Sequence, residues 1–290
     1  MLRRALSSSL AVAVGLACLV APGVADALLP GAREARDGRT ALSANLSGRR
    51  ETVPGDRDGV ARADVRLLPG RACFRLRWSG VAPPVSAELR RGARGAAGPV
   101  AVLLFAAPGG LPPDVRSVHG CAPAGAAALA AVRDHPGRFY LEVRTTELPA
   151  GAVRGQLFRA THTDAAPPAG PAATLAGAEE VPGPGDGDGA ATAHLRARGA
   201  RVCFQLRWRD LAPVTAIHVH EGGAGTIGGV AAALVVGELP ATLDGAGGCV
   251  TGVDRTLVRR LRSRPAGFYV NLHTTGHVDG AVRGQLRPGS

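Results

Sequence analysis

The feature that most constrains the fold is an internal repeat, in which similar segments return at an offset of about 130 residues. The segment RACFRLRW at 71–78 returns as RVCFQLRW at 201–208. Likewise, GRFYLEVRTTELPAGAVRGQL at 137–157 returns as GFYVNLHTTGHVDGAVRGQL at 267–286. Since the segments recur in the same order and at nearly the same offset, the chain is predicted to form two tandem modules with one shared fold.

The repeat also predicts where the modules begin and end. We expect module 1 at residues 40–159 and module 2 at residues 171–290. The stretch between them, 160–170, is rich in proline and small residues and has no apolar periodicity, so it is predicted to be a linker.

The N-terminus has the features of a secretory signal peptide at residues 1–27, followed by a short segment at 28–39. Two arginines precede an apolar run, and Ala25-Asp26-Ala27 fits a cleavage site. The alternative is a membrane anchor, but the apolar run is shorter than the ~20 residues that a span needs. No other stretch is long and apolar enough to cross a membrane. The protein is therefore predicted to be secreted or held in the cell envelope.

Within each module the apolar residues alternate with a period of two. In the repeated segment of module 2, Phe204, Leu206 and Trp208 share one face, and the polar residues between them share the other. Short strands of this kind, separated by Gly, Pro and Asp turns, predict an all-β fold, an antiparallel sandwich or barrel. One short helix is expected in each module, near 124–133 and 255–262.

Four cysteines lie outside the signal segment, two in each module: Cys73, Cys121, Cys203 and Cys249. An even number in a secreted chain predicts disulfides. Of the three pairings, the one within modules is favoured, because each repeat carries its own pair at a similar separation. The alternative is a metal thiolate site, which the lack of any CxxC spacing argues against.

The charge is strongly positive, with a formal net charge of +11. All of it comes from arginine, because the sequence contains no lysine. The arginines are scattered and aromatic residues make up only 3% of the chain, which argues against nucleic-acid binding. The expected partner is an extracellular protein or an acidic cell-surface polymer, attracted in a salt-sensitive way.

The most informative segment is AIHVHEGGAGTIGGV at 216–230, whose counterpart in module 1 is AELRRGARGAAGPV at 87–100. Both copies keep three glycines, so the glycines are assigned to the turn. His218 and His220 lie at i and i+2 and would project from one face of a strand, about 7 Å apart. This face is predicted to be the outer one, since the alternating Ile and Val residues face the core.

His273 is predicted to lie on the outer face of a later strand. If the two strands are close, three imidazoles converge into a ligand set that is seen in open Zn or Cu sites. In module 1 all three positions change together, to Glu88, Arg90 and Arg144, which predicts that the three residues touch. The hypothesis is a Cu or Zn site formed by the three histidines. The alternative is a hydrogen-bonded surface network without metal.

The other histidines are weaker candidates. His277 follows a Thr-Gly pair in a predicted turn and is considered as a fourth ligand, whereas His194 is expected to be an exposed strand residue. His119, His135 and His162 are placed in loops or the linker without partners and are assigned no role.

Four further charged residues are assigned structural roles, because both modules keep them: Glu51 and Arg154 in module 1, Glu180 and Arg283 in module 2. Each arginine is expected to pair with the glutamate of its own module.

The string His-Val-His-Glu-Gly at 218–222 is similar to the copper-binding strand of copper-zinc superoxide dismutase, a β-sandwich with an internal disulfide. That resemblance implies a copper- or zinc-dependent redox enzyme as the alternative function. The chain departs from that family's pattern in its zinc ligands, because Asp244, Asp254, His277 and Asp279 do not reproduce their spacing. No nucleophile or phosphate-binding motif is present either.

Both modules resemble the chordin-type domain, called CHRD. The matching residues of module 2 are Leu175, Gly177, Glu180-Val181-Pro182, His218-Val219-His220, Tyr269-Val270-Asn271-Leu272-His273-Thr274 and Gly280 to Leu286. Those of module 1 are Leu46, Gly48, Glu51, Val53-Pro54 and Gly151 to Leu157, with a departure at all three histidines. The resemblance implies a secreted all-β module; chordin itself is an extracellular protein that binds growth factors. We therefore expect a secreted, non-catalytic binding or structural protein, with the candidate site in module 2.

Overall fold

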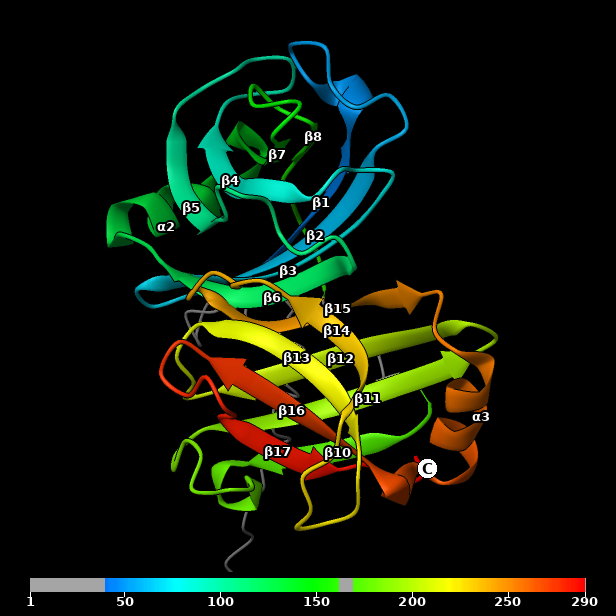
Figure 1. Ribbon diagram of the computed structural model, residues 1–290. Coiled ribbons are helices and arrows are strands. Elements are labelled where there is room, and N and C mark those ends of the chain that lie inside the picture. The colour runs from blue at the N-terminus through cyan, green and yellow to red at the C-terminus, as the bar shows by residue number, and fades with distance from the viewer. Residues whose placement is uncertain (1–39, 162–168, 290) are drawn as a thin grey trace, which may run out of the picture.

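The computed structural model describes residues 40–161 and 169–289 (Figure 1). The predicted signal peptide, the segment 28–39 and most of the predicted linker lie outside the described residues. Within them, two all-β modules are joined along one side. None of the described helices has the length and apolar character needed to cross a membrane.

Module 1 contains nine strands, one α-helix and two short 3-10 helices. The strands are β1 (Thr40–Ser47), β2 (Val60–Leu68), β3 (Arg71–Ser79), β4 (Pro84–Arg91), β5 (Val100–Ala106), β6 (Val115–Pro123), β7 (Phe139–Thr145), β8 (Val153–Gln156) and β9 (Phe158–Arg159). The helix α2 spans Ala126–Asp134, and the 3-10 helices are η1 (Gly48–Arg50) and η2 (Pro136–Arg138).

Module 2 repeats this series, with β9 reduced to a single antiparallel bridge between Ala172 and Arg287. Its strands are β10 (Ala172–Ala176), β11 (Ala190–Arg198), β12 (Arg201–Arg209), β13 (Val214–Glu221), β14 (Val230–Val236), β15 (Leu243–Thr251), β16 (Phe268–Thr274) and β17 (Val282–Gln285). The helix α3 spans Arg255–Ser263, and the 3-10 helices are η3 (Gly177–Glu179) and η4 (Pro265–Gly267).

The strands are antiparallel and follow the same order in both modules. In module 1 the ladders run through β6, β3, β2, β1, β8, β7, β4 and β5. In module 2 they run through β15, β12, β11, β10, β17, β16, β13 and β14. This order places β13 beside β16, although their sequences are far apart, and so brings together the two strands that carry the candidate histidines.

The core follows the predicted period of two. Phe204, Leu206 and Trp208 are buried, whereas the polar residues that alternate with them are partly or fully exposed. Ile217 and Val219 of β13 are likewise fully buried. Burying each large apolar side chain stabilises the fold by about 1.5–3 kcal/mol, so the pattern fixes which face of each strand turns inward. The all-β fold predicted from the sequence is thus confirmed.

The predicted short helix is present in each module. In α3 the Asp254 side chain accepts a hydrogen bond from the Leu257 backbone N–H, at 2.8 Å, and so caps the first turn. Three buried residues of this helix, Leu257, Val258 and Leu261, join the core. Since each helix is only nine residues long, its stability depends on this packing rather than on helix propensity.

The disulfides pair within modules, as expected. Cys73 of β3 is bonded to Cys121 of β6, and Cys203 of β12 is bonded to Cys249 of β15. The two residues of each pair lie directly opposite each other in neighbouring strands. Closing loops of 48 and 46 residues stabilises each module by about 3–4 kcal/mol in the chain-entropy model.

The modules are joined by their own equivalent strands, because β6 of module 1 pairs antiparallel with β15 of module 2 (Figure 1). The register is nearly symmetric: Leu243 lies opposite Gly120, and Gly248 lies opposite Val115. In the repeat, Gly120 corresponds to Gly248 and Val115 corresponds to Leu243, so each of these two pairs is the equivalent of the other. The junction therefore has a pseudo-two-fold axis like that of an isologous dimer. One antiparallel sheet therefore continues from module 1 into module 2.

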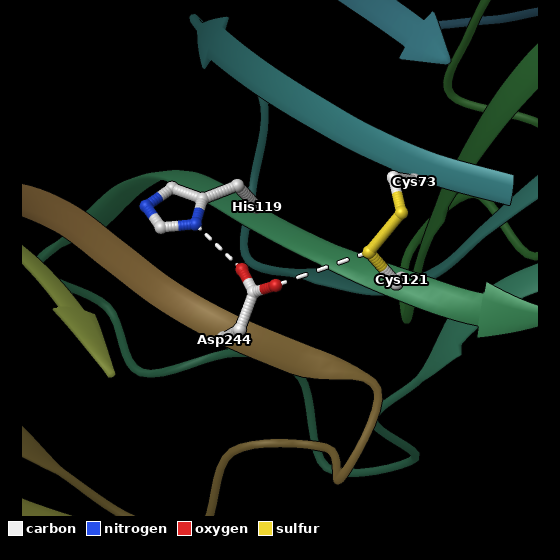
Figure 2. The surroundings of a disulfide bond; sticks show 4 residues. All are labelled: Cys73, His119, Cys121 and Asp244. Atoms are coloured by element: carbon white, nitrogen blue, oxygen red, sulfur yellow. Dashed lines mark hydrogen bonds and ion pairs between the residues drawn. A yellow bond between two sulfur atoms is a disulfide. The ribbon is translucent and has the colours of Figure 1, made fainter. Parts of the chain in front are cut away.

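A polar contact lies beside this junction (Figure 2). The ring Nδ1 of His119 on β6 forms a hydrogen bond of 2.7 Å with the carboxylate of Asp244 on β15. The other carboxylate oxygen of Asp244 lies 4.0 Å from the Cys121 sulfur. The prediction that His119 is a loop residue without a partner is wrong, because its partner belongs to the other module and no local pattern reveals it.

Candidate metal centre

Three histidines of module 2 converge on the outer face of β13 and β16. His218 lies opposite Asn271 in the ladder, and His273 lies two pairs further along, opposite Ala216. This diagonal relation brings the His218 and His273 ring centroids to 5.1 Å. The His218 and His220 centroids, two residues apart on β13, are 5.7 Å apart.

Backbone carbonyls fix the orientation of two of these rings. Nδ1 of His220 lies 2.9 Å from the Gly228 carbonyl oxygen, and Nδ1 of His273 lies 2.9 Å from that of Val278. A carbonyl can only accept, so Nδ1 carries the proton in both rings. The Nε2 atoms of His220 and His273 are buried and have no hydrogen-bond partner among the described residues. Each therefore presents an unshared lone pair, the arrangement found in metal-ligating histidines.

The spacing of the ligand atoms fits one ion. One ring nitrogen from each histidine lies within 4.8 Å of the others. Zinc–nitrogen bonds of about 2.0–2.1 Å around one ion place ligand atoms roughly 3.3–4 Å apart. The cluster thus needs only small side-chain rotations to close on a metal, and three protein ligands leave a further coordination position.

The cluster favours neutral imidazoles. Burial, with smaller contributions from the neighbouring His273 and His220, lowers the pKa of His218 from 6.5 to about 4. Burial also lowers the pKa of His220, although the hydrogen bond to Gly228 opposes this shift. Since only a neutral imidazole binds a metal, these shifts keep the ligands available without competition from protons near neutral pH.

The His220 ring is supported by the packed side chains of Tyr269 and Arg283. Its ring stacks on Tyr269, with a centroid distance of 4.9 Å and an interplanar angle of 6°. The Arg283 guanidinium lies 3.5 Å from the centre of the same Tyr269 ring. Arg283 Nη2 also donates to the carbonyls of Gly223 and Thr226, at 3.0 and 2.7 Å. The arginine thus anchors the glycine-rich turn whose Gly228 carbonyl orients His220.

The glycines of this turn have the structural role predicted for them. Gly225 has a φ of +71°, and its counterpart Gly95 has +76°, values that favour glycine. A Cβ atom on Gly228 would lie 1.7 Å from the Glu221 carbonyl oxygen, and one on Gly98 would lie 1.6 Å from that of Arg91. Both modules therefore need glycine for the turn itself.

Each arginine acts on the glutamate of its own module only electrostatically: it opposes the effect of burial, which raises the pKa of Glu51 and of Glu180. No hydrogen bond or ion pair joins Arg283 to Glu180 or Arg154 to Glu51 within the described parts of the chain. Arg154 instead donates to the Ala96 carbonyl at 3.0 Å, as Arg283 does to the equivalent turn. Both arginines are buried, and each donates to backbone carbonyls of the turn, where the sequence suggested carboxylates.

Asn271 is a residue of the candidate metal centre to which the sequence analysis assigned no role. It faces His218 across the ladder, and its Nδ2 donates to Glu180 at 3.1 Å. Burial raises the pKa of Glu180 to about 7, against the lowering effects of Asn271 and Arg283. Two signals were present in the sequence: Asn271 lies in the CHRD-like segment that also contains His273, and it becomes Glu142 in module 1, where the histidines change as well.

In module 1 an ion-pair network occupies the equivalent position. Arg90 contacts Glu88 at 2.5 Å and Glu142 at 3.5 Å, and Arg144 contacts the same carboxylates at 3.8 and 3.0 Å. Arg90 Nε also donates to Gly98, the counterpart of the carbonyl that orients His220. The three changed positions therefore do touch, as predicted, and a fourth residue, Glu142, balances the charge.

The remaining histidines lie apart from the cluster. His277 Nδ1 is 3.8 Å from a carboxylate oxygen of Asp186 and does not belong to the three-histidine group. His194 lies on β11 opposite Gln205, and His135 lies at the end of α2. His162 is outside the described residues. Within the described ranges, the three histidines of module 2 are the one group of ligand residues close enough to share an ion.

The fold and the repeat define a tandem protein of two small antiparallel β-modules, one with clustered histidines and one with ion pairs in their place. The CHRD domain model matches residues 42–157 and 172–286, which cover most of both modules. The chain therefore belongs to the CHRD domain family and carries two tandem copies of the domain. A search of curated proteins found no match.

Proposed function

We propose that this CHRD protein acts outside the cytoplasm as a non-catalytic binding protein, in which module 2 holds one Cu or Zn ion through His218, His220 and His273. The observation that carries the proposal is the orientation of the rings. Two Nδ1 atoms are engaged by backbone carbonyls, and the two Nε2 atoms are left buried and unpartnered beside His218. A hydrogen-bonded network without metal would instead pair these nitrogen atoms with one another or with other side chains.

Two further observations support the proposal. Two disulfides are typical of proteins that fold in an oxidising compartment, which agrees with secretion or retention in the cell envelope. Module 1, which lacks the histidines, replaces them with a charge-balanced network. Module 1 is accordingly assigned a structural or partner-binding role, and module 2 carries the site.

The experiment is a calorimetric titration of metal-free two-module protein with Zn²⁺ and Cu²⁺. We expect one equivalent to bind to the wild type and none to H218A/H220A. The control is H135A/H194A, which removes two histidines outside the cluster and should bind as the wild type does. Absence of binding to the wild type at micromolar metal would refute the proposal, and so would equal loss of binding in the control.

A copper- or zinc-dependent redox enzyme is the second candidate. The observation that favours it is the coordination position that three protein ligands leave for a small molecule. The only cation beside the cluster, among the described residues, is Arg283, which is buried and engaged by turn carbonyls. A superoxide disproportionation assay of metal-loaded wild type and H218A/H220A separates the two functions. Metal binding without a rate above that of the variant supports the non-catalytic protein.

A further inference from the structure

A second candidate site lies in module 1, and its lining does not include Glu88, Arg90, Glu142 or Arg144 of the ion-pair network. It is a cavity of about 210 Å³ between the end of β1, the β8–β9 segment and the glycine-rich turn 91–99. Its polar and aromatic lining consists of Asn45, Arg50, Arg94, Arg154, Gln156 and Phe158. Three guanidinium groups thus face one small cavity whose lining contains no carboxylate.

The three arginines differ in how they are held. Arg154 is 2% exposed, stacks on Tyr140 with 3.6 Å to the ring centre, and has an Nη1 atom without a hydrogen-bond partner. Arg50 donates to the Asn45 carbonyl through Nη1 alone. Arg94 forms no hydrogen bond or ion pair with any described residue and is exposed on the turn. The cavity therefore has a fixed cation at its base and two cations with free donors at its rim.

Comparison of the two modules shows that the two arginines at the rim, Arg50 and Arg94, occur only in module 1. The counterparts of Arg50 and Arg94 in module 2 are Glu179 and Ala224. Module 2 keeps only the buried arginine, as Arg283, and has Arg287 in place of Phe158. The fold of the turn does not require the two rim arginines, because module 2 forms the same turn without them.

We propose that this cavity, the arginine pocket, binds a small oxyanion: a sulfate, phosphate or carboxylate group. Guanidinium groups present paired donors that match such groups, and three of them around one cavity concentrate positive potential there. The volume suits a single anionic group rather than a drug-sized ligand, which occupies roughly 300–1,000 Å³. The apolar face of Phe158, 42% exposed, provides contact for the carbon skeleton that carries the group.

Glu51 is the acidic residue that interacts with Arg154, and its effect on the pocket is limited. No hydrogen bond or ion pair joins the two, and Glu51 does not line the cavity. Burial raises the pKa of Glu51 to about 7, so its carboxyl is only partly ionised near neutral pH.

The test compares two double variants of the two-module protein that remove the same net charge. R50A/R94A removes the rim of the pocket, and R49A/R57A removes two exposed arginines that do not line it. Sulfate and inorganic phosphate are titrated while the arginine Nε–Hε NMR signals are followed, with chloride at matched ionic strength as the blank. In a second arm, both variants are eluted from heparin, a sulfated polysaccharide, with a salt gradient.

We expect saturable binding of one ion per chain, weakened about tenfold or more in R50A/R94A and less than about twofold in R49A/R57A, since tenfold corresponds to one good contact. If neither free ion saturates but R50A/R94A alone elutes from heparin at lower salt, the pocket binds the group as part of a polymer. Equal behaviour of the two variants in both arms overturns the proposal, because the arginines then act only as general surface charge.

Discussion

The junction between the modules offers a sharp test of the packing argument. Gly120 of β6 and Gly248 of β15 are related by the repeat, and each faces the backbone of the other module. A Cβ atom on Gly120 would lie 2.0 Å from the Thr242 carbonyl oxygen, and one on Gly248 would lie 1.9 Å from that of Asp114. The same two carbonyls accept the junction hydrogen bonds from Cys121 N and Cys249 N, at 2.9 and 3.2 Å.

Each Gly→Ala substitution should therefore push the strands apart and break one of these hydrogen bonds. The lost bond costs about 0.5–1.5 kcal/mol and the forced displacement about 1–3 kcal/mol, so we expect the junction to weaken by about 2–4 kcal/mol per substitution. A loss of that size raises the population of the opened junction by roughly 30- to 1,000-fold. The cores of the modules should be unaffected, because the closest atoms belong to the partner module.

Native-state hydrogen exchange measures this directly at the Cys121 and Cys249 amides. In G120A and G248A these amides should exchange faster, while the amides that join β11 to β12 keep their protection. The control is G125A/G267A, because a Cβ atom at either position meets nothing within 4 Å. Unchanged protection at the junction, or equal loss in the interior of both modules, would refute the reasoning.

Three further predictions concern the cores and the charged residues. L206A, which truncates a fully buried side chain, should lower the free energy of unfolding by about 2–5 kcal/mol in urea denaturation; a loss below 1 kcal/mol would contradict its place in the core. E142A should cost about 3–5 kcal/mol in the same assay, because Arg90 and Arg144 lose a buried carboxylate, whereas R62A, an exposed pair partner, should cost under about 1 kcal/mol. Glu51 has a pKa raised from 4.5 to about 7, so its contribution to stability is full below pH 4.5 and is lost as the pH rises to 7. The difference in the free energy of unfolding between E51Q and the wild type should therefore grow in favour of E51Q by about 1 kcal/mol from pH 4.5 to pH 7, after solvent screening. A difference that does not change with pH would contradict the raised pKa of Glu51.

The sequence predicted much of the fold because the relevant signals are local or repeated. Alternation at Phe204, Leu206 and Trp208 predicts which face of β12 is buried, and the duplicated cysteine spacing favours the observed pairing. The convergence of His218, His220 and His273 could be inferred because the same positions change together in module 1. A repeat thus supplied contact information that a single copy lacks.

Other contacts could not be predicted, because they depend on surfaces created only by folding. The pairing of His119 with Asp244 requires β6 and β15 to meet, and neither strand carries a pattern that specifies its partner. Arg154 and Arg283 were expected to pair with the glutamates of their own modules. They instead lie under the glycine-rich turns, whose carbonyl orientation cannot be read from residue types.

The central claim, that three imidazoles of module 2 form one metal site, is tested most directly by NMR of the histidine ring nitrogens. Metal-free protein labelled with ¹⁵N is titrated with Zn²⁺. At one equivalent we predict that the His218, His220 and His273 rings shift together, and that His220 and His273 keep their Nδ1 protons and bind the metal through Nε2. The claim is contradicted if these rings do not change at one equivalent, or if His119, His135, His194 or His277 shift in their place.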